Sequence, residues 1–242
     1  MLSGVFILSA LLCALWLAWG VLRPFDFAFD LWYSSLQLEQ KIAHYAPANR
    51  FRFAFENTSY TERKEIYQQI SHNIHAKEAL FDQIVYRTQD GKVIDYFLTS
   101  PEIQHLEDVN RLITKAQWIG KVATALFLSV CCFYILIPSA QFSLQAQGIV
   151  AIVITALLFT PIVIFGPQKV FDTLHQTIFP ANHPWFFFYE DSLMTLLMYA
   201  PYSFAVISAL LGGITLFFFG LLTFFGLNVK KVVMKDGRKT KN

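Results

Sequence analysis

The sequence predicts a membrane α-helical fold: four transmembrane helices, with a small extracytoplasmic α+β domain containing a short β-hairpin between spans 1 and 2. Three observations support this fold class. The first two concern composition: 55% of the 242 residues are hydrophobic, and only 15% are charged, against about 25% in soluble domains. The third is a set of four apolar runs, each long enough to cross a hydrocarbon core of about 30 Å. These runs make the lipid bilayer an expected partner. A net charge of +2 gives no basic footprint, so nucleic acid is not an expected partner.

The apolar runs divide the chain into eight segments. Spans are expected at residues 1–22, 118–138, 148–166 and 200–227. The segments between and after them are an extracytoplasmic domain, a cytoplasmic loop, an extracytoplasmic interfacial loop and a basic cytoplasmic tail, at 23–117, 139–147, 167–199 and 228–242. The first run could be a signal peptide, but no basic region precedes it and it exceeds the usual length of an apolar core, so we expect a retained anchor.

The basic tail sets the orientation. It carries six Lys and Arg residues against one acid, Asp236. The positive-inside rule therefore places the tail in the cytoplasm, and four spans place the N-terminus there too. We expect a multi-pass protein of the cytoplasmic (inner) membrane, with both long polar segments outside.

The extracytoplasmic segments contain recognisable local signals. A helix is expected from about residue 59 to 75, capped by Ser59 or Thr61. Asp90-Gly91 between two β-rich runs predicts a hairpin with a type I′ turn. A second helix is expected near Ser100, which would cap it, and the stretch 191–198 predicts a short helix lying in the membrane interface.

All six histidines fall outside the membrane in this topology, at positions 44, 72, 75, 105, 175 and 183. Most are typical of surface or capping positions. His105 and Asp108 share a helix face, so the carboxylate could fix the imidazole tautomer as in general-base sites. The alternative is an exposed helix with an incidental pair. His175 follows the third apolar run by about nine residues, where polar groups are costly unless they are used or paired.

The two histidine motifs together resemble a known family. "HLEDV" at 105–109 precedes the second span, and "LHQTIFP" at 174–180, followed by Trp185, comes after the third. In a four-span chain this combination is similar to the lipoprotein intramolecular transacylase family of bacterial membrane proteins. In one respect the chain departs from the family pattern: Leu174 stands where an aromatic residue precedes the second histidine, with Phe171 one turn earlier.

The resemblance implies an activity and a site. The family moves an acyl chain from the sn-2 oxygen of a lipoprotein's diacylglyceryl group to the α-amine of its lipidated N-terminal cysteine, giving a lyso-form lipoprotein. It implies His105 and His175 as the catalytic pair, diacylglyceryl-modified lipoproteins as partners, and no cofactor or metal. We expect supporting roles for Asp108 and Asp191. Substrate or lipid contacts are expected at three aromatic positions: Phe171, Phe179 and Trp185.

Turning an ester into an amide requires a base for the amine and a donor for the oxyanion and the departing alkoxide. Two histidines can divide these tasks near neutral pH. No enzyme nucleophile is needed because the substrate tethers its own amine and ester, and the sequence has no GxSxG elbow. We expect His175 as base and His105, oriented by Asp108, as the polarising or proton-donating partner, with the reverse division open. A straight helix from His105 to Trp118 would rise about 20 Å, so we expect a sharp turn between them.

Two other functions remain open at this level. His105, His175, His183 and Asp108 could supply the ligands of a metal-dependent membrane hydrolase, although no HExxH motif is present. A non-enzymatic membrane scaffold or sensor would explain the outside domain and its aromatic loop. The acylation state of a lipoprotein's N-terminus distinguishes these readings.

Overall fold

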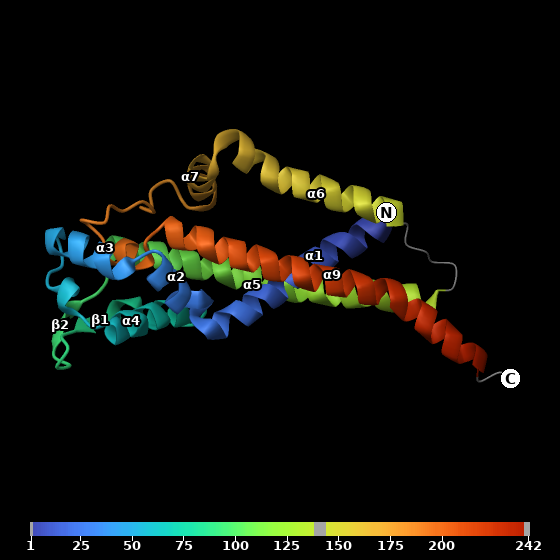
Figure 1. Ribbon diagram of the computed structural model, residues 1–242, viewed down its shortest axis with the longest axis horizontal. Helices are drawn as coiled ribbons and strands as arrows, with labels where there is room; N and C mark the ends of the chain where they lie inside the picture. Colours follow the sequence, from blue (N-terminus) through green and yellow to red (C-terminus); the bar gives the residue numbers. More distant parts are fainter. Residues whose placement is uncertain (1, 138–143, 240–242) are drawn as a thin grey trace. The chain divides into compact units, whose positions relative to one another are not determined.

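The computed structural model describes residues 2–137 and 144–239 (Figure 1). The expected cytoplasmic loop at 139–147 and the end of the basic tail therefore lie partly outside the described residues. The chain forms two compact units. The first comprises Met1–Leu22, Ala116–Val170 and Ala209–Asn242, and the second comprises Arg23–Lys115 and Phe171–Ser208.

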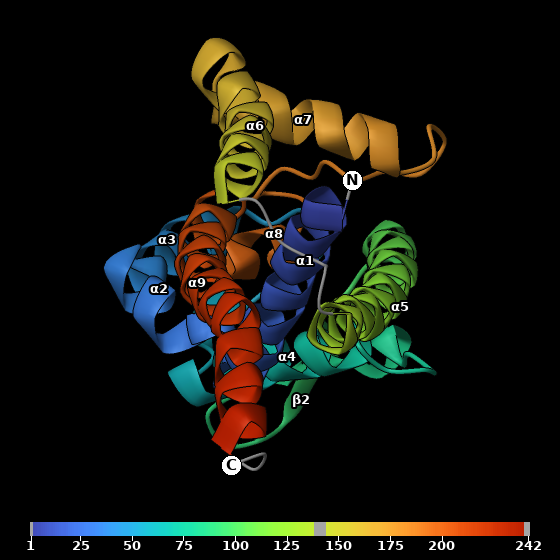
Figure 2. The ribbon, with the colours of Figure 1, turned by 90° about the vertical axis from the view of Figure 1, so that its right-hand side faces the viewer.

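The first unit contains four helical stretches, one for each apolar run. They are α1 (Leu2–Leu22), the later part of α5 (Ser100–Leu136), α6 (Leu144–Phe165) and most of α9 (Tyr202–Lys239). Figures 1 and 2 show α1, α5 and α9 side by side, and side chains of all three form one apolar cluster, including Phe6, Phe127 and Leu222. Among the described residues, three helical stretches have the length and hydropathy to cross a membrane: Gly4–Ser35, Ser100–Leu136 and Tyr202–Gly226.

Two glycines allow the helices of the first unit to approach closely. A Cβ at Gly120 of α5 would lie 2.6 Å from the Trp16 ring of α1, and one at Gly226 of α9 would lie 2.7 Å from the Phe6 ring. Small residues at such contacts are the usual means by which apolar helices pack in lipid.

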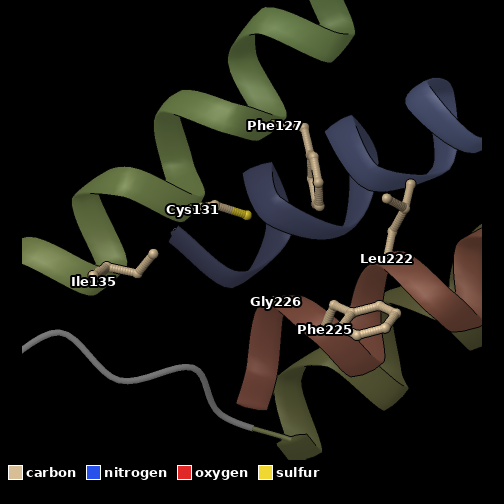
Figure 3. Close-up of a pocket in the computed structure, with 6 residues that line it drawn as sticks. All are labelled: Phe127, Cys131, Ile135, Leu222, Phe225 and Gly226. Carbon is tan, nitrogen blue, oxygen red and sulfur yellow. The ribbon is translucent and has the colours of Figure 1, made fainter. Parts of the chain in front are cut away.

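A small cavity lies between α5 and α9 in this unit. Its volume is about 180 Å³. Figure 3 shows its six lining residues: Phe127, Cys131, Ile135, Leu222, Phe225 and Gly226. None of these residues carries a carboxylate or an imidazole, so this cavity does not offer the acid–base chemistry that the sequence analysis anticipates.

The second unit is built from short elements around one core. In chain order these are η1 (Arg23–Ala28), α2 (Phe29–Ser35), α3 (Leu38–Tyr45), η2 (Ala46–Ala48), η3 (Phe55–Asn57), α4 (Tyr60–Asn73), η4 (Phe81–Gln83), β1 (Val85–Arg87), β2 (Val93–Tyr96), the first turns of α5, α7 (Pro167–Ile178) from Phe171 onward, and α8 (Leu193–Met198). The core buries Trp32, Ile66, Tyr86 and Phe97 together with Leu196 of α8. The leucines of α8 complete a core that residues 23–117 supply only in part.

Several local predictions are confirmed. Ser59 caps α4, since its hydroxyl accepts a hydrogen bond from the Glu62 N–H at 3.1 Å. The short helix expected at 191–198 is present as α8, and Ser192 caps it by accepting from the Thr195 N–H at 2.9 Å. Strands β1 and β2 form the expected antiparallel hairpin beside α4 (Figure 1).

The expected turn type and the expected cap of α5 are wrong. A type I′ turn needs positive φ at both central residues, whereas only Gly91 has positive φ here, at 83°. The Gly91 N–H donates to the Thr88 carbonyl, so Gly91 is the last residue of the turn and does not occupy its centre. At α5, Thr99 rather than Ser100 is the capping residue: its N–H and hydroxyl both donate to Glu102, at 2.5 and 2.6 Å.

The sharp turn expected between His105 and Trp118 is also wrong. Helix α5 runs without interruption from Ser100 to Leu136. The residues between the two positions include neither proline nor glycine, so each backbone N–H and carbonyl can continue the helical hydrogen-bond pattern.

Candidate active site

Three parts of the second unit form the candidate site. They are the first turns of α5, the end of α7, and residues 179–192, which we call the aromatic loop. Glu102, His105 and Asp108 follow each other at intervals of three residues and so share one face of α5. Each of them contacts the aromatic loop, through hydrogen bonds or ring packing. These turns carry charged residues and precede the apolar part of α5, so we treat them as lying outside the span.

Glu102 fixes the end of the aromatic loop. Its side chain is fully buried. One carboxylate oxygen accepts from Thr99 at the start of α5, and the other accepts from the Ser192 hydroxyl and the Met194 N–H at the start of α8. One carboxylate thus satisfies donors at two helix N-termini, where the helix dipole also favours a negative charge. Glu102 was not among the site residues expected from the sequence, although its place three residues after Thr99 is a capping-box signal.

The imidazole of His105 is held in an apolar environment. Its ring lies 5.0 Å from the Phe179 ring and 6.1 Å from the Phe187 ring, measured between centroids. Burial and the nearby charge of His175 lower the pKa of His105 to about 4, despite the opposing effect of Asp108. Its Nδ1 is buried and has no hydrogen-bond partner among the described residues. His105 is therefore neutral near pH 7, and Nε2 is the ring nitrogen left to meet a substrate.

The imidazole of His175 is surrounded by three aromatic rings. Their centroids lie at 3.9 Å for Phe171, 5.1 Å for Trp185 and 5.4 Å for Phe179. The Nδ1 of His175 lies 2.9 Å from the Phe171 carbonyl oxygen. Because a carbonyl can only accept, Nδ1 carries a proton, and in the neutral tautomer of the ring the free lone pair is on Nε2. That is the tautomer a general base requires.

Phe179 brings the two histidines together. Both imidazoles pack against its ring, which is 8% exposed. The sequence placed these histidines 70 positions apart, on separate segments, and the structure collects them in one aromatic cluster. The three aromatic positions expected as substrate contacts, Phe171, Phe179 and Trp185, all pack against His175 in this cluster.

Asp108 does not orient His105 as expected. Its carboxylate accepts from His183 Nδ1 at 2.6 Å and from the Arg111 guanidinium. Burial alone would raise the pKa of Asp108, but these two hydrogen bonds together with the charges of Arg111 and His183 outweigh it and lower the pKa below its ordinary value. Spacing along the helix correctly placed His105 and Asp108 on one face, but it could not show that a loop residue would reach the carboxylate first.

The contact between His183 and Asp108 could not be predicted from the sequence. The backbone turns at His183, since the His183 N–H donates to the Pro180 carbonyl at 3.0 Å. The side chain, however, turns inward to Asp108 and is only 20% exposed. Nothing in the local sequence indicates this partner, which lies 75 residues earlier.

Asp191 is engaged elsewhere. Its carboxylate pairs with the Arg50 guanidinium at 2.5 and 2.6 Å, and the Arg50 N–H donates to the Glu190 carbonyl at 2.8 Å. These contacts tie the end of the aromatic loop to the segment after η2. Within the described ranges, no group of three or more His, Cys, Asp and Glu side chains is arranged to hold a metal ion.

Fold and site together define a class: a helical membrane protein whose second unit carries two clustered imidazoles suited to acid–base chemistry. The model of one family, the lipoprotein intramolecular transacylase Lit, matches residues 6–204, and the chain belongs to this family. It is thus an acyltransferase, integral to a membrane, of a family that acts on lipoproteins.

Solved structures of this family share the fold. Two crystallised forms of the lipoprotein intramolecular transacylase Lit from Bacillus cereus, one with a histidine replaced by arginine and one with a histidine replaced by alanine, superpose with TM-scores of 0.65 and 0.63. They are 15% and 16% identical to this chain. The matches cover 99% and 98% of this chain and 93% and 94% of theirs. A comparison with curated proteins finds no match.

Proposed function

We propose that this chain moves the sn-2 acyl chain of a diacylglyceryl lipoprotein to the α-amine of its N-terminal cysteine, with His105 and His175 in acid–base roles. The observation that carries the proposal is the packing of both imidazoles on Phe179, with His175 Nδ1 donating to a backbone carbonyl. This arrangement leaves one nitrogen of each ring, Nε2, for the substrate.

The reaction requires three proton or charge movements, and the two rings can supply them. His175 Nε2 takes a proton from the α-amine as the amine attacks the ester carbonyl. The Nε2–H of neutral His105 donates a hydrogen bond to the developing oxyanion, as a neutral imidazole can. The tetrahedral intermediate then breaks its bond to the sn-2 oxygen, and the proton held by His175 passes to that oxygen. The products are an amide and a free hydroxyl, and no water is consumed.

In this proposal α1, α5, α6 and α9 cross the inner membrane, with both termini in the cytoplasm and the site at the outer leaflet. Three described helical stretches meet the length and hydropathy requirement. The 22 residues of α6 would extend about 33 Å. Single cysteines in the tail and in the 23–117 segment, labelled from outside intact spheroplasts, test the orientation: only the second should react.

The depth of the site depends on where the bilayer meets α5. Because α5 does not bend, His105 lies at the lipid interface only if the membrane surface reaches the first turns of this helix. Glu107 is exposed on these turns. A spin label attached to Glu107→Cys therefore measures the depth of the first turns of α5 relative to the membrane surface. Full accessibility to a water-soluble relaxation agent and none to oxygen in lipid would count against an interfacial site.

Mass spectrometry of a purified diacylglyceryl lipoprotein, incubated with the enzyme, tests the reaction. We expect an acyl chain moved to the cysteine amine, with total mass unchanged. His105→Ala and His175→Ala should each abolish the transfer, while His72→Ala, at an exposed position of α4, should leave it intact. Loss of the chain to water, with activity sensitive to chelator, would favour the hydrolase. Unaltered acylation with wild-type protein would favour the scaffold.

A further inference from the structure

The aromatic loop has no regular secondary structure over residues 179–192, yet it supplies rings that contact both histidines. Phe179 and Phe187 contact His105, and Phe179 and Trp185 contact His175. A segment without helix or strand hydrogen bonds is positioned by its side-chain contacts. The location of these rings therefore depends on the packing of Phe187 and Tyr189 against the core and on the polar contacts that hold the loop.

Polar contacts to α5 occur near both ends of the loop. At one end Ser192 donates to the buried Glu102. Near the other, His183 donates to Asp108. Glu102 and Asp108 stand one turn before and one turn after His105 on the same face of α5. The His183 contact thus lies between Phe179 and Trp185 in the sequence, and on α5 it lies one turn after His105.

The Asp108–His183 contact has the properties of a strong polar anchor. The carboxylate is 7% exposed, its distance to Nδ1 is 2.6 Å, and its pKa is lowered by the hydrogen bonds it accepts from His183 and Arg111. A hydrogen bond to an ionised and buried acceptor is stronger than one between neutral groups. Removing the His183 donor leaves one oxygen of this buried carboxylate unpaired and the charge opposed only by the half-exposed Arg111 guanidinium.

We propose that Asp108 and His183 form a latch that holds the aromatic loop against α5, and that both are positioning residues for acyl transfer. The latch acts through Phe179 and Trp185, which set the placement of the His105 and His175 rings. This inference rests on the proposed histidine pair. In it, His183 uses Nδ1 for the latch and performs no proton transfer with the substrate.

The test compares two substitutions at the same position. His183→Asn keeps an N–H donor near the place of Nδ1, whereas His183→Ala removes it. A displacement of catalytic groups by about 1 Å can cost about 100-fold in rate, so we expect His183→Ala to lower kcat by about that factor with KM little changed. His183→Asn should keep most of the activity, with the pH profile of kcat unchanged in shape. Arg111→Gln is the matched control, because Arg111 binds the other oxygen of Asp108 from a 55% exposed position.

Two further measurements distinguish the latch from a direct role of His183 in acyl transfer. Because the pair acts as one unit, the double variant Asp108→Ala/His183→Ala should lose no more activity than either single variant. In ¹⁵N-histidine NMR spectra, His183→Ala should shift the ring signals of His105 and His175, while circular dichroism confirms the fold.

An inactive but folded His183→Asn, or additive losses in the double variant, would assign His183 a direct role and overturn the latch. Full activity of His183→Ala would overturn it as well. If His183→Ala fails to fold, the activity and pH profile of His183→Asn decide alone. The His105→Ala and His175→Ala variants distinguish the failure of the two proposals. If either variant retains activity, the proposed histidine pair is wrong. If both are inactive while the latch variants behave as wild type, only the latch is wrong.

Discussion

Acidification should destabilise the folded protein through His105. An unfolded histidine titrates near pH 6.5, whereas the pKa of His105 in the fold is about 4. Since one pKa unit corresponds to about 1.36 kcal/mol, the difference of roughly 2.5 units amounts to at most about 3 kcal/mol. Because the pKa is lowered on folding, this stabilisation is fully present above pH 6.5 and is lost as the pH falls toward 4.

The perturbation that isolates this contribution is His105→Phe, which keeps an aromatic ring against Phe179 but cannot titrate. Between pH 7 and pH 4.5 the wild-type protein should lose most of the 3 kcal/mol relative to this variant. For a chain of this size that equals a relative shift of roughly 6–12 °C in Tm. Burial also lowers the pKa of His75, but both proteins share this group, so its effect cancels in the comparison.

The assay is thermal unfolding in detergent micelles at a series of pH values, with ¹⁵N-histidine NMR to follow the His105 ring directly. Parallel loss of stability in wild type and His105→Phe would refute the reasoning. Titration of His105 near pH 6.5 would do the same, because it would mean that burial does not exclude the charged form.

Three more predictions concern packing and polar contacts. Gly120→Ala should lower the Tm because its methyl group would overlap the tryptophan ring of α1, while Gly212→Ala, with open space around it, should be neutral or raise Tm slightly through helix propensity; equal Tm values would contradict the close contact. Ser192→Ala should cost about 1–3 kcal/mol, since it removes a helix cap and a partner of buried Glu102; chemical unfolding measures this, and an unchanged midpoint would show that the pair contributes nothing. Asp191→Asn should change stability by at most about 1 kcal/mol and leave acyl transfer within about threefold, because its arginine partner is 65% exposed; a large loss in the mass-spectrometric assay would restore Asp191 as a functional residue.

Local features of the site unit were predictable because neighbouring residues determine them. The hydroxyl of Ser59 caps α4 through a donor three residues away, and Ser192 caps α8 in the same way. The same proximity explains the errors. Thr99 and Ser100 are both good capping residues, and only the reach of Glu102 toward Thr99 decides between them. The continuity of α5 between His105 and Trp118 was also readable from the lack of glycine and proline in that stretch, although the depth expected for an interfacial ester favoured a bend.

The sequence by itself determined the membrane class, the four apolar runs and the two histidine motifs, because hydropathy and motif spacing depend only on residue order. Which side chains share a site was decided by the tertiary structure. Asp108 could reach His105 one turn away or a histidine 75 residues later, and the packing of His105 on Phe179 leaves the carboxylate to His183. Contacts between distant segments depend on how a loop folds back over a helix, and no local pattern in the chain specifies that path.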